Sequence, residues 1–245
     1  MKKIVLSVFF AASAVFVSCK NDDDVTELKK LPKSITSVNS NLLFTYSASG
    51  QLVKVTDKDS ETEYTETIFA YDSNGKVTKF VNIYNSPGGT DTETYTISYP
   101  TANQAKVTDE DNDYVLVNFN EKGQVLNFNS FGDVTTFSYD TKGNIVKIVN
   151  GNSTTTANYN SDKGILSGIT SPKWVLLLSD FDLYYFGENN PISVTNVSEN
   201  QGTTYTSSEA YSYPIEHVID GYPTRMSVNY SENGSTENEV YTINY

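Results

Sequence analysis

The stretch Phe69-Ala70-Tyr71-Asp72-Ser73-Asn74-Gly75-Lys76-Val77-Thr78-Lys79-Phe80 carries the unit from which the fold is built. An aromatic-x-aromatic pair leads into an Asp-x-x-Gly turn, and a short run of mainly β-branched residues follows. The carboxylate of Asp72 can accept hydrogen bonds from nearby turn amides, and Gly75 stands where the chain needs a positive φ. The stretch therefore predicts a β-hairpin with a type I turn closed by a glycine bulge.

Degenerate copies of this unit recur along the chain. The aromatic positions Tyr99, Phe119, Tyr139 and Tyr159 follow one another at steps of 20 residues, enough for two strands and two turns. About five clear units and several weaker ones predict about 12–14 antiparallel strands in sequence order. The clear copies turn at Gly50, Gly75, Gly123 and Gly143, and a stretched copy turns at Gly164.

Alternation along the strands predicts that both faces of the sheet are partly apolar. The aromatics before each turn should share a face with Leu52, Val77 and Ile145, while Val55 and Ile148 should line the other face. Lys54, Lys79 and Lys147 should lie beside the tyrosines, where a lysine-tyrosine stripe can hold sugar rings or simply cover aromatic surface. We therefore predict an all-β fold, a single curled antiparallel meander forming a half-barrel or a barrel. Which face lies inside is open at this stage.

The repeat breaks between Tyr159 and Phe186, where the step is 27 residues. This segment contains the apolar run Trp174-Val175-Leu176-Leu177-Leu178, preceded by Pro172, and predicts one short helical or irregular insertion. The insertion can plug the curled sheet, or it can expose Trp174 with Tyr184, Tyr185 and Phe186 as a ligand or docking patch.

The N-terminus predicts export and lipid anchoring. Lys2 and Lys3 precede an apolar stretch, and Phe16-Val17-Ser18-Cys19 resembles a bacterial lipobox, which implies acylation of Cys19. An ordinary secretory signal with an incidental cysteine is the alternative. We expect a signal peptide at 1–18, an acylated N-terminus and flexible linker at 19–40, and a single β-repeat domain at 41–245.

Charge limits the partners. The net charge is −13, and removal of residues 1–18 takes away two lysines and no acid, which leaves −15. Nucleic acid is therefore not an expected partner, because phosphate binding needs a basic patch. The same charge disfavours anionic lipid head groups as the main target, so the expected contact with the membrane is the lipid anchor at Cys19.

The inventory of reactive side chains is small. His217 is the one histidine and Arg225 the one arginine, so a Ser-His-Asp set has only His217 to use, and we expect no enzyme and no cofactor. Asp109-Glu110-Asp111-Asn112-Asp113 resembles the start of a calcium loop, but Tyr114 and Asn120 occupy the positions of its glycine and its final glutamate. A hairpin turn rich in acids is the expected structure there, without a metal site, and weak adventitious calcium binding is the alternative.

Several segments resemble known families. Tyr71-Asp72-Ser73-Asn74-Gly75 and Tyr139-Asp140-Thr141-Lys142-Gly143 are similar to the tyrosine-aspartate repeats of bacterial shell-forming and wall-associated proteins. Lys20-Asn21-Asp22-Asp23-Asp24 resembles the acidic export tag of Bacteroidetes surface lipoproteins. With Ser171–Leu178, Leu183–Gly187 and Asn189-Asn190-Pro191, the chain resembles a Bacteroidetes lipoprotein family of unknown function described as having a porin-like fold.

This resemblance implies an outer-membrane lipoprotein, with the cell surface as its first expected location and the periplasmic side as the second. A membrane pore is not expected, because Glu61, Glu63, Glu66, Asp91 and Glu93 interrupt the apolar face that a lipid-exposed strand needs. The expected function is a binding or structural module for a glycan or a protein, without catalysis. The alternative is a carboxylate-dependent glycoside hydrolase, or an accessory protein of a glycan-uptake system.

Overall fold

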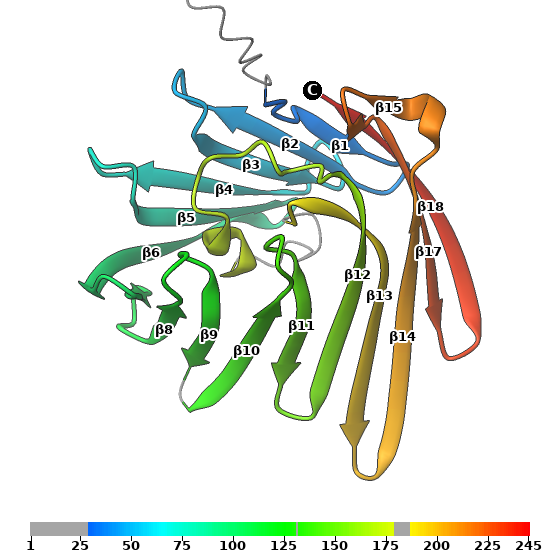
Figure 1. Ribbon diagram of the computed structural model, residues 1–245. Coiled ribbons are helices and arrows are strands. Elements are labelled where there is room, and N and C mark those ends of the chain that lie inside the picture. Colours follow the sequence, from blue (N-terminus) through cyan, green and yellow to red (C-terminus); the bar gives the residue numbers. More distant parts are fainter. Residues whose placement is uncertain (1–28, 131, 179–186) are drawn as a thin grey trace, which may run out of the picture.

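The structure, a computed structural model, describes residues 29–130, 132–178 and 187–245 of the 245-residue chain. Among these residues sixteen strands form one closed antiparallel barrel, and two further strands form a separate small hairpin (Figure 1). The predicted all-β curled meander is therefore confirmed, and the sheet closes completely. The strands are β1 (Ser34–Thr36), β2 (Asn41–Tyr46), β3 (Leu52–Lys58), β4 (Tyr64–Tyr71), β5 (Val77–Ser86), β6 (Gly89–Thr101), β7 (Gln104–Thr108), β8 (Tyr114–Phe119), β9 (Val125–Ser130), β10 (Asp133–Tyr139), β11 (Ile145–Asn150), β12 (Ser153–Lys163), β13 (Asn189–Asn200), β14 (Thr203–Ser212), β15 (Val218–Ile219), β16 (Tyr222–Pro223), β17 (Arg225–Glu232) and β18 (Ser235–Asn244).

The barrel has more strands than the expected 12–14, because degenerate stretches such as β6 and β14 also form full strands. The short strand β1 closes the barrel by pairing with both β2 and β18. It lies within residues 19–40, which the sequence assigns to the linker, since three residues carry too little pattern to be recognised as a strand. Within the described ranges, none of the helical turns is long and apolar enough to cross a membrane.

The hairpin turns have the predicted chemistry. Asp72 Oδ1 accepts hydrogen bonds from the amides of Asn74 and Lys76 at 2.8 and 2.9 Å, and Gly75 has a φ of +79°. Asn120 and Asp140 accept the corresponding pair of amides in the next two clear copies. A side-chain oxygen at the turn entry and a left-handed glycine therefore fix each hairpin.

A bulge after each turn reverses part of the predicted face assignment. Tyr46 pairs with Leu52 as expected, but the register then shifts by one residue, so Phe44 pairs with Val55. Both Leu52 and Val55 thus face inward, and the prediction that Val55 lines the other face is wrong. The same shift recurs in the copies at β4–β5, β8–β9 and β10–β11, and it places Ile148 inside the barrel as well.

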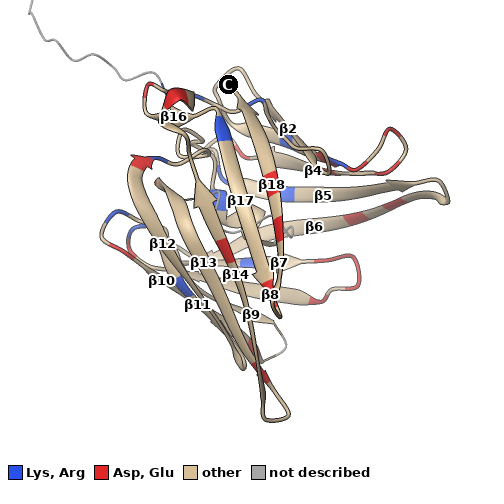
Figure 2. Cartoon of the chain, turned by 90° about the vertical axis from the view of Figure 1, so that its right-hand side faces the viewer, with Lys and Arg blue, Asp and Glu red and all other residues tan. Residues whose placement is uncertain are grey.

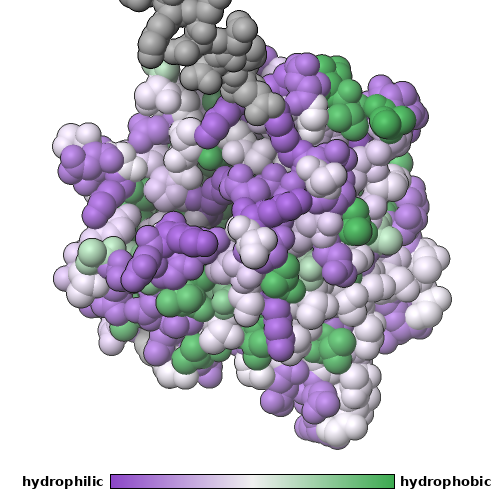
Figure 3. Space-filling view, viewed as in Figure 1, coloured by the Kyte–Doolittle hydropathy of each residue, from purple (hydrophilic) through white to green (hydrophobic). Residues whose placement is uncertain are grey.

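The interior contains one apolar core, and the outer wall is largely polar. Buried inward residues such as Phe80, Val117 and Ile148 form one continuous core with the insertion after β12. Hydrophobic residues on the face shown in Figure 3 are scattered among hydrophilic ones. The outward positions of β6, β12 and β14 are dominated by threonine, with Thr92, Thr94, Thr96, Thr154, Thr156, Thr204 and Thr206 as examples.

Residues 164–178, here called the plug, pack against the inner face at one end of the barrel, the plugged end. Figure 1 shows this segment leaving β12 and crossing back toward β5 and β9. Its last part is a single 3-10 helix, η1 (Lys173–Leu178), which confirms the expected short insertion. Ser171 accepts a hydrogen bond from the Leu52 amide at 2.7 Å, so the plug also reaches β3.

Both ends of the described chain lie at the plugged end. Lys30 passes so close to Gly168 that a Cβ at Gly168 would lie 2.1 Å from the Lys30 carbonyl oxygen. The amide of Lys33 donates to the carbonyl of Asn244 at 2.6 Å. The plug is therefore held against the first described residues as well as against the barrel wall.

Candidate functional site

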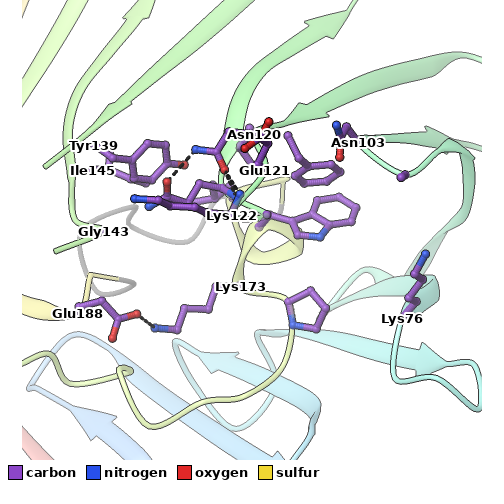
Figure 4. Close-up of a pocket in the computed structure, with 18 of the residues that line it drawn as sticks. Lys76, Asn103, Asn120, Glu121, Lys122, Tyr139, Gly143, Ile145, Lys173 and Glu188 are labelled. Atoms are coloured by element: carbon purple, nitrogen blue, oxygen red, sulfur yellow. Dashed lines mark hydrogen bonds and ion pairs between the residues drawn. The ribbon is translucent and has the colours of Figure 1, made fainter. Parts of the chain in front are cut away.

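A pocket of about 680 Å³ lies at the plugged end, between the hairpin turns and the plug (Figure 4). The turn 120–124 joins β8 to β9, and the turn 140–144 joins β10 to β11. Lys76, at the end of a third turn, and Lys173 on the plug line it from other sides. We call this the plug pocket. Its volume lies in the range of small-molecule sites, and it forms at the break in the repeat.

Trp174 contributes to the wall of the plug pocket. Its side chain is 9% exposed and meets Phe119 of β8 edge-on, with ring centroids 5.4 Å apart. The indole therefore fills the plug while lining the pocket. The other residues of the predicted patch, Tyr184, Tyr185 and Phe186, lie outside the described residues, as does Cys19.

The turn 140–144 forms a rigid wall of the pocket. Asn144 is fully buried, and its side-chain amide donates to Asp140 at 2.8 Å and to Asn189 at 3.1 Å. Burial acts to raise the pKa of Asp140, but hydrogen bonds from Asn144, Lys142 and Gly143 outweigh it and leave the pKa below its usual value. The turn is thus tied to the start of β13 and holds an ionised carboxylate.

Two lysines of the pocket have partners within it. Lys173 Nζ lies 3.3 Å from Glu188 Oε1. Burial lowers the pKa of Lys173, and Glu188 opposes that shift. Lys76 Nζ lies 4.7 Å from the centroid of the Tyr99 ring, and burial raises the pKa of Tyr99 to about 12. These contacts hold two positive charges at the edge of an aromatic surface.

Three residues singled out from the sequence lie elsewhere. Lys54, Lys79 and Lys147 occupy positions opposite Thr45, Ala70 and Ser138 on the outer wall, away from the inward tyrosines. The prediction that they share a face with the tyrosines is wrong, because the bulge inserts one residue between the turn and each lysine. The lysines that do meet the pocket lie in or beside the turns, where strand alternation carries no information.

The other reactive residues have structural contacts. Asp109 Oδ1 accepts hydrogen bonds from the amides of Asp111 and Asp113, which makes the acidic segment a hairpin turn of the expected kind. His217 ends the 3-10 helix η3 (Ile215–His217), and its carbonyl accepts a hydrogen bond from the Thr224 amide at 2.6 Å. Across the described residues, no three His, Cys, Asp or Glu side chains gather in a way that could hold a metal ion.

Comparison with known proteins gives structural matches only. No family model matches the chain, and no curated protein matches it. A porin-like protein from Bacteroides uniformis is similar in structure, with a TM-score of 0.41 and 15% identity over 89% of this chain and 98% of its own. A porin-like protein from Bacteroides vulgatus is similar with a TM-score of 0.41 and 13% identity. The match covers 88% of this chain and 99% of that protein's chain. At these values the likeness does not bear on function, which depends on this chain's own residues.

Proposed function

We propose that this protein is a lipid-anchored outer-membrane module, facing the cell surface, that binds a glycan in the plug pocket without catalysing a reaction. The observation that carries the proposal is the position of the pocket. The plug interrupts the run of repeated hairpins and, within the described residues, forms a cavity together with four hairpin turns, those that end β4, β6, β8 and β10.

The composition of the pocket wall suits a saccharide. Phe119, Trp174 and Tyr139 offer apolar ring edges, while Asn103 and the turn lysines offer hydrogen-bond donors. Sugars present both C–H faces and hydroxyl groups, so sites of mixed aromatic and polar character match them. A protein segment is the second candidate ligand.

The polarity of the barrel supports a role in water. A barrel that crosses a bilayer has an apolar outer belt and a polar interior. Here an apolar core fills one part of the interior, and threonine-rich rows lie outside. The proposed contact with the membrane is therefore through acyl chains on Cys19, outside the described residues. Labelling with a clickable fatty acid should be lost in Cys19→Ala, and equal labelling of that variant would contradict the anchor.

The binding proposal is tested by blocking the pocket. Ala102 lines it, so Ala102→Trp should abolish binding of the protein to an immobilised glycan array, while Ala70→Trp, on the outer wall, should bind as the parent does. Array glycans recovered intact would agree with a binding module. Cleaved glycans would favour the alternative of a glycoside hydrolase, and binding retained in Ala102→Trp would place the site elsewhere.

A further inference from the structure

The plug pocket has the opposite charge to the protein. The chain carries a net charge of −13. The pocket is nevertheless lined by four lysines, Lys76, Lys122, Lys142 and Lys173, and by two glutamates, Glu121 and Glu188. The lining residues thus include two more lysines than acids, although the ionised Asp140 lies in the adjacent turn. This concentration of lysine needs an explanation in a chain with nearly twice as many acids as bases.

The repeat itself presents two of these lysines side by side. Lys122 and Lys142 each precede the turn glycine, Gly123 or Gly143, and their amides donate to Asn120 and Asp140 at 2.9 Å. The strands β9 and β10 pair with each other, so the two turns are neighbours at the plugged end. Their backbones are fixed, and both side chains project from equivalent positions.

These two lysines also have free charges. In the part of the chain that the structure describes, neither the Lys122 nor the Lys142 ammonium group forms an ion pair with a carboxylate. Lys173, by contrast, is paired with Glu188. Among the charged residues that line the pocket and form no ion pair within the described chain, the lysines Lys76, Lys122 and Lys142 outnumber the single acid, Glu121.

Acids lie at both ends of the barrel, but a dense run of them lies at the end opposite the plug. The turn 109–113 between β7 and β8, which carries Asp109, Glu110, Asp111 and Asp113, lies there and appears red in Figure 2. Inward carboxylates of the same half, such as Glu93 and Glu239, are hydrogen-bonded by Tyr95 and Tyr241. The separation of charge along the barrel axis directs an anion toward the plugged end and away from the opposite one.

From this geometry we propose that the plug pocket selects acidic saccharides, in which a carboxylate or sulfate group contacts Lys122 and Lys142 while the sugar ring lies along the aromatic wall. This inference rests on the proposed glycan-binding function and names its ligand class. Two exposed ion pairs contribute about 1 kcal/mol together, which corresponds to about a fivefold change in Kd. Neutral saccharides of the same length lack these contacts.

The test is calorimetric titration of the full chain carrying Cys19→Ala, which keeps acyl groups out of the measurement. The probes are an oligogalacturonide as the carboxylated saccharide, a carrageenan oligosaccharide as the sulfated one, and a galacto-oligosaccharide of equal length as the neutral one. We expect the acidic probes to bind more tightly, with Kd rising as salt is added. The double variant Lys122→Gln with Lys142→Gln should raise the Kd of the acidic probes about fivefold. The tighter of the two acidic probes identifies the preferred group.

The matched control is Lys79→Gln with Lys147→Gln, which removes the same charge from the outer wall and should leave Kd unchanged. An equal loss of affinity for the acidic probes in both double variants would mean that only the net charge of the protein matters, and would overturn the inference. Equal binding of neutral and acidic probes, still blocked by Ala102→Trp, would overturn it while leaving the glycan-binding function in place. Binding of no probe would contradict both.

Discussion

Tyrosine hydroxyls bind the turns of the barrel to one another. Tyr71 donates to the carbonyl of Leu52 at 2.5 Å, Tyr99 to that of Val77 at 2.9 Å, and Tyr159 to that of Ile145 at 2.8 Å. In each case the acceptor is the first strand residue after the preceding turn. The tyrosine of the repeat therefore does more than fill the core, because its hydroxyl also donates a hydrogen bond to a main-chain carbonyl of the preceding hairpin.

Two tyrosines at the plugged end lack such a partner. The hydroxyls of Tyr213 and Tyr245 are buried and have no hydrogen bond with any of the residues that the structure describes. Burial raises the pKa of both side chains above the usual tyrosine value. A buried hydroxyl without a partner loses its hydration and gains nothing in return.

These two environments predict opposite effects of the same substitution. Tyr71→Phe should lower the free energy of unfolding by about 1 kcal/mol, since it removes the hydrogen bond to the Leu52 carbonyl. Tyr213→Phe should leave that free energy unchanged or raise it, since it removes an unsatisfied group. Urea unfolding of both variants measures the difference. Equal destabilisation by the two substitutions would show that the Tyr213 hydroxyl has a partner in solution.

At the scale of the hairpin, the turn glycine is required by backbone conformation and not by space. Gly123 has a φ of +76°, and a Cβ added there would meet no atom within 4 Å. Gly123→Ala should therefore cost about 1 kcal/mol of stability through strain alone. Gly88→Ala is the matched control, since that turn glycine does not have a positive φ and an added Cβ would make only an ordinary contact with Ser86 Oγ at 3.7 Å. If both variants unfold at the same urea concentration, the strain at Gly123 is not the reason for its glycine.

The hairpins are also the part of the fold that the sequence predicts best. An Asp or Asn at the turn entry and a Gly three residues later are local signals, so the turns at Gly75 and Gly143 could be assigned directly. The bulge after each turn could not be predicted from the sequence, because it depends on how the two strands pair. One inserted residue moved Val55 to the core and Lys54 to the outer wall. Strand alternation therefore assigned residues to the wrong face of the sheet only beyond the bulge.

The sequence predicted the plug side of the pocket but not the lysines of the hairpin turns. The break in the repeat predicted the insertion and pointed to Trp174, which lines the pocket. The lysines of neighbouring turns were missed, because Lys122 and Lys142 are 20 residues apart and meet the plug only after the barrel closes. The recurring Lys-Gly at two turn ends was the signal that could have found them.

The barrel as a whole should be sensitive to alkali. Burial raises the pKa of Tyr99 and Tyr139 to about 12, above the usual value near 10. A raised pKa in the folded state means that the stabilisation is complete below about pH 10 and is lost as the pH rises toward about 12. The free energy of unfolding in urea should fall over this interval, while absorbance at 295 nm reports tyrosinate. Titration of all tyrosines near pH 10 in the folded protein would contradict their burial.

The closure of the barrel joins the two ends of the described chain, since Ile35 of β1 pairs with Ile243 of β18. The ribosome delivers β1 among the first strands and β18 last. One edge of β1 can pair with β2 at once. Its other edge must wait for β18, more than two hundred residues away, and closing so long a loop is slow. The inner face therefore stays accessible at this seam until β18 has been synthesised, so closure of the barrel depends on the ten residues of that strand.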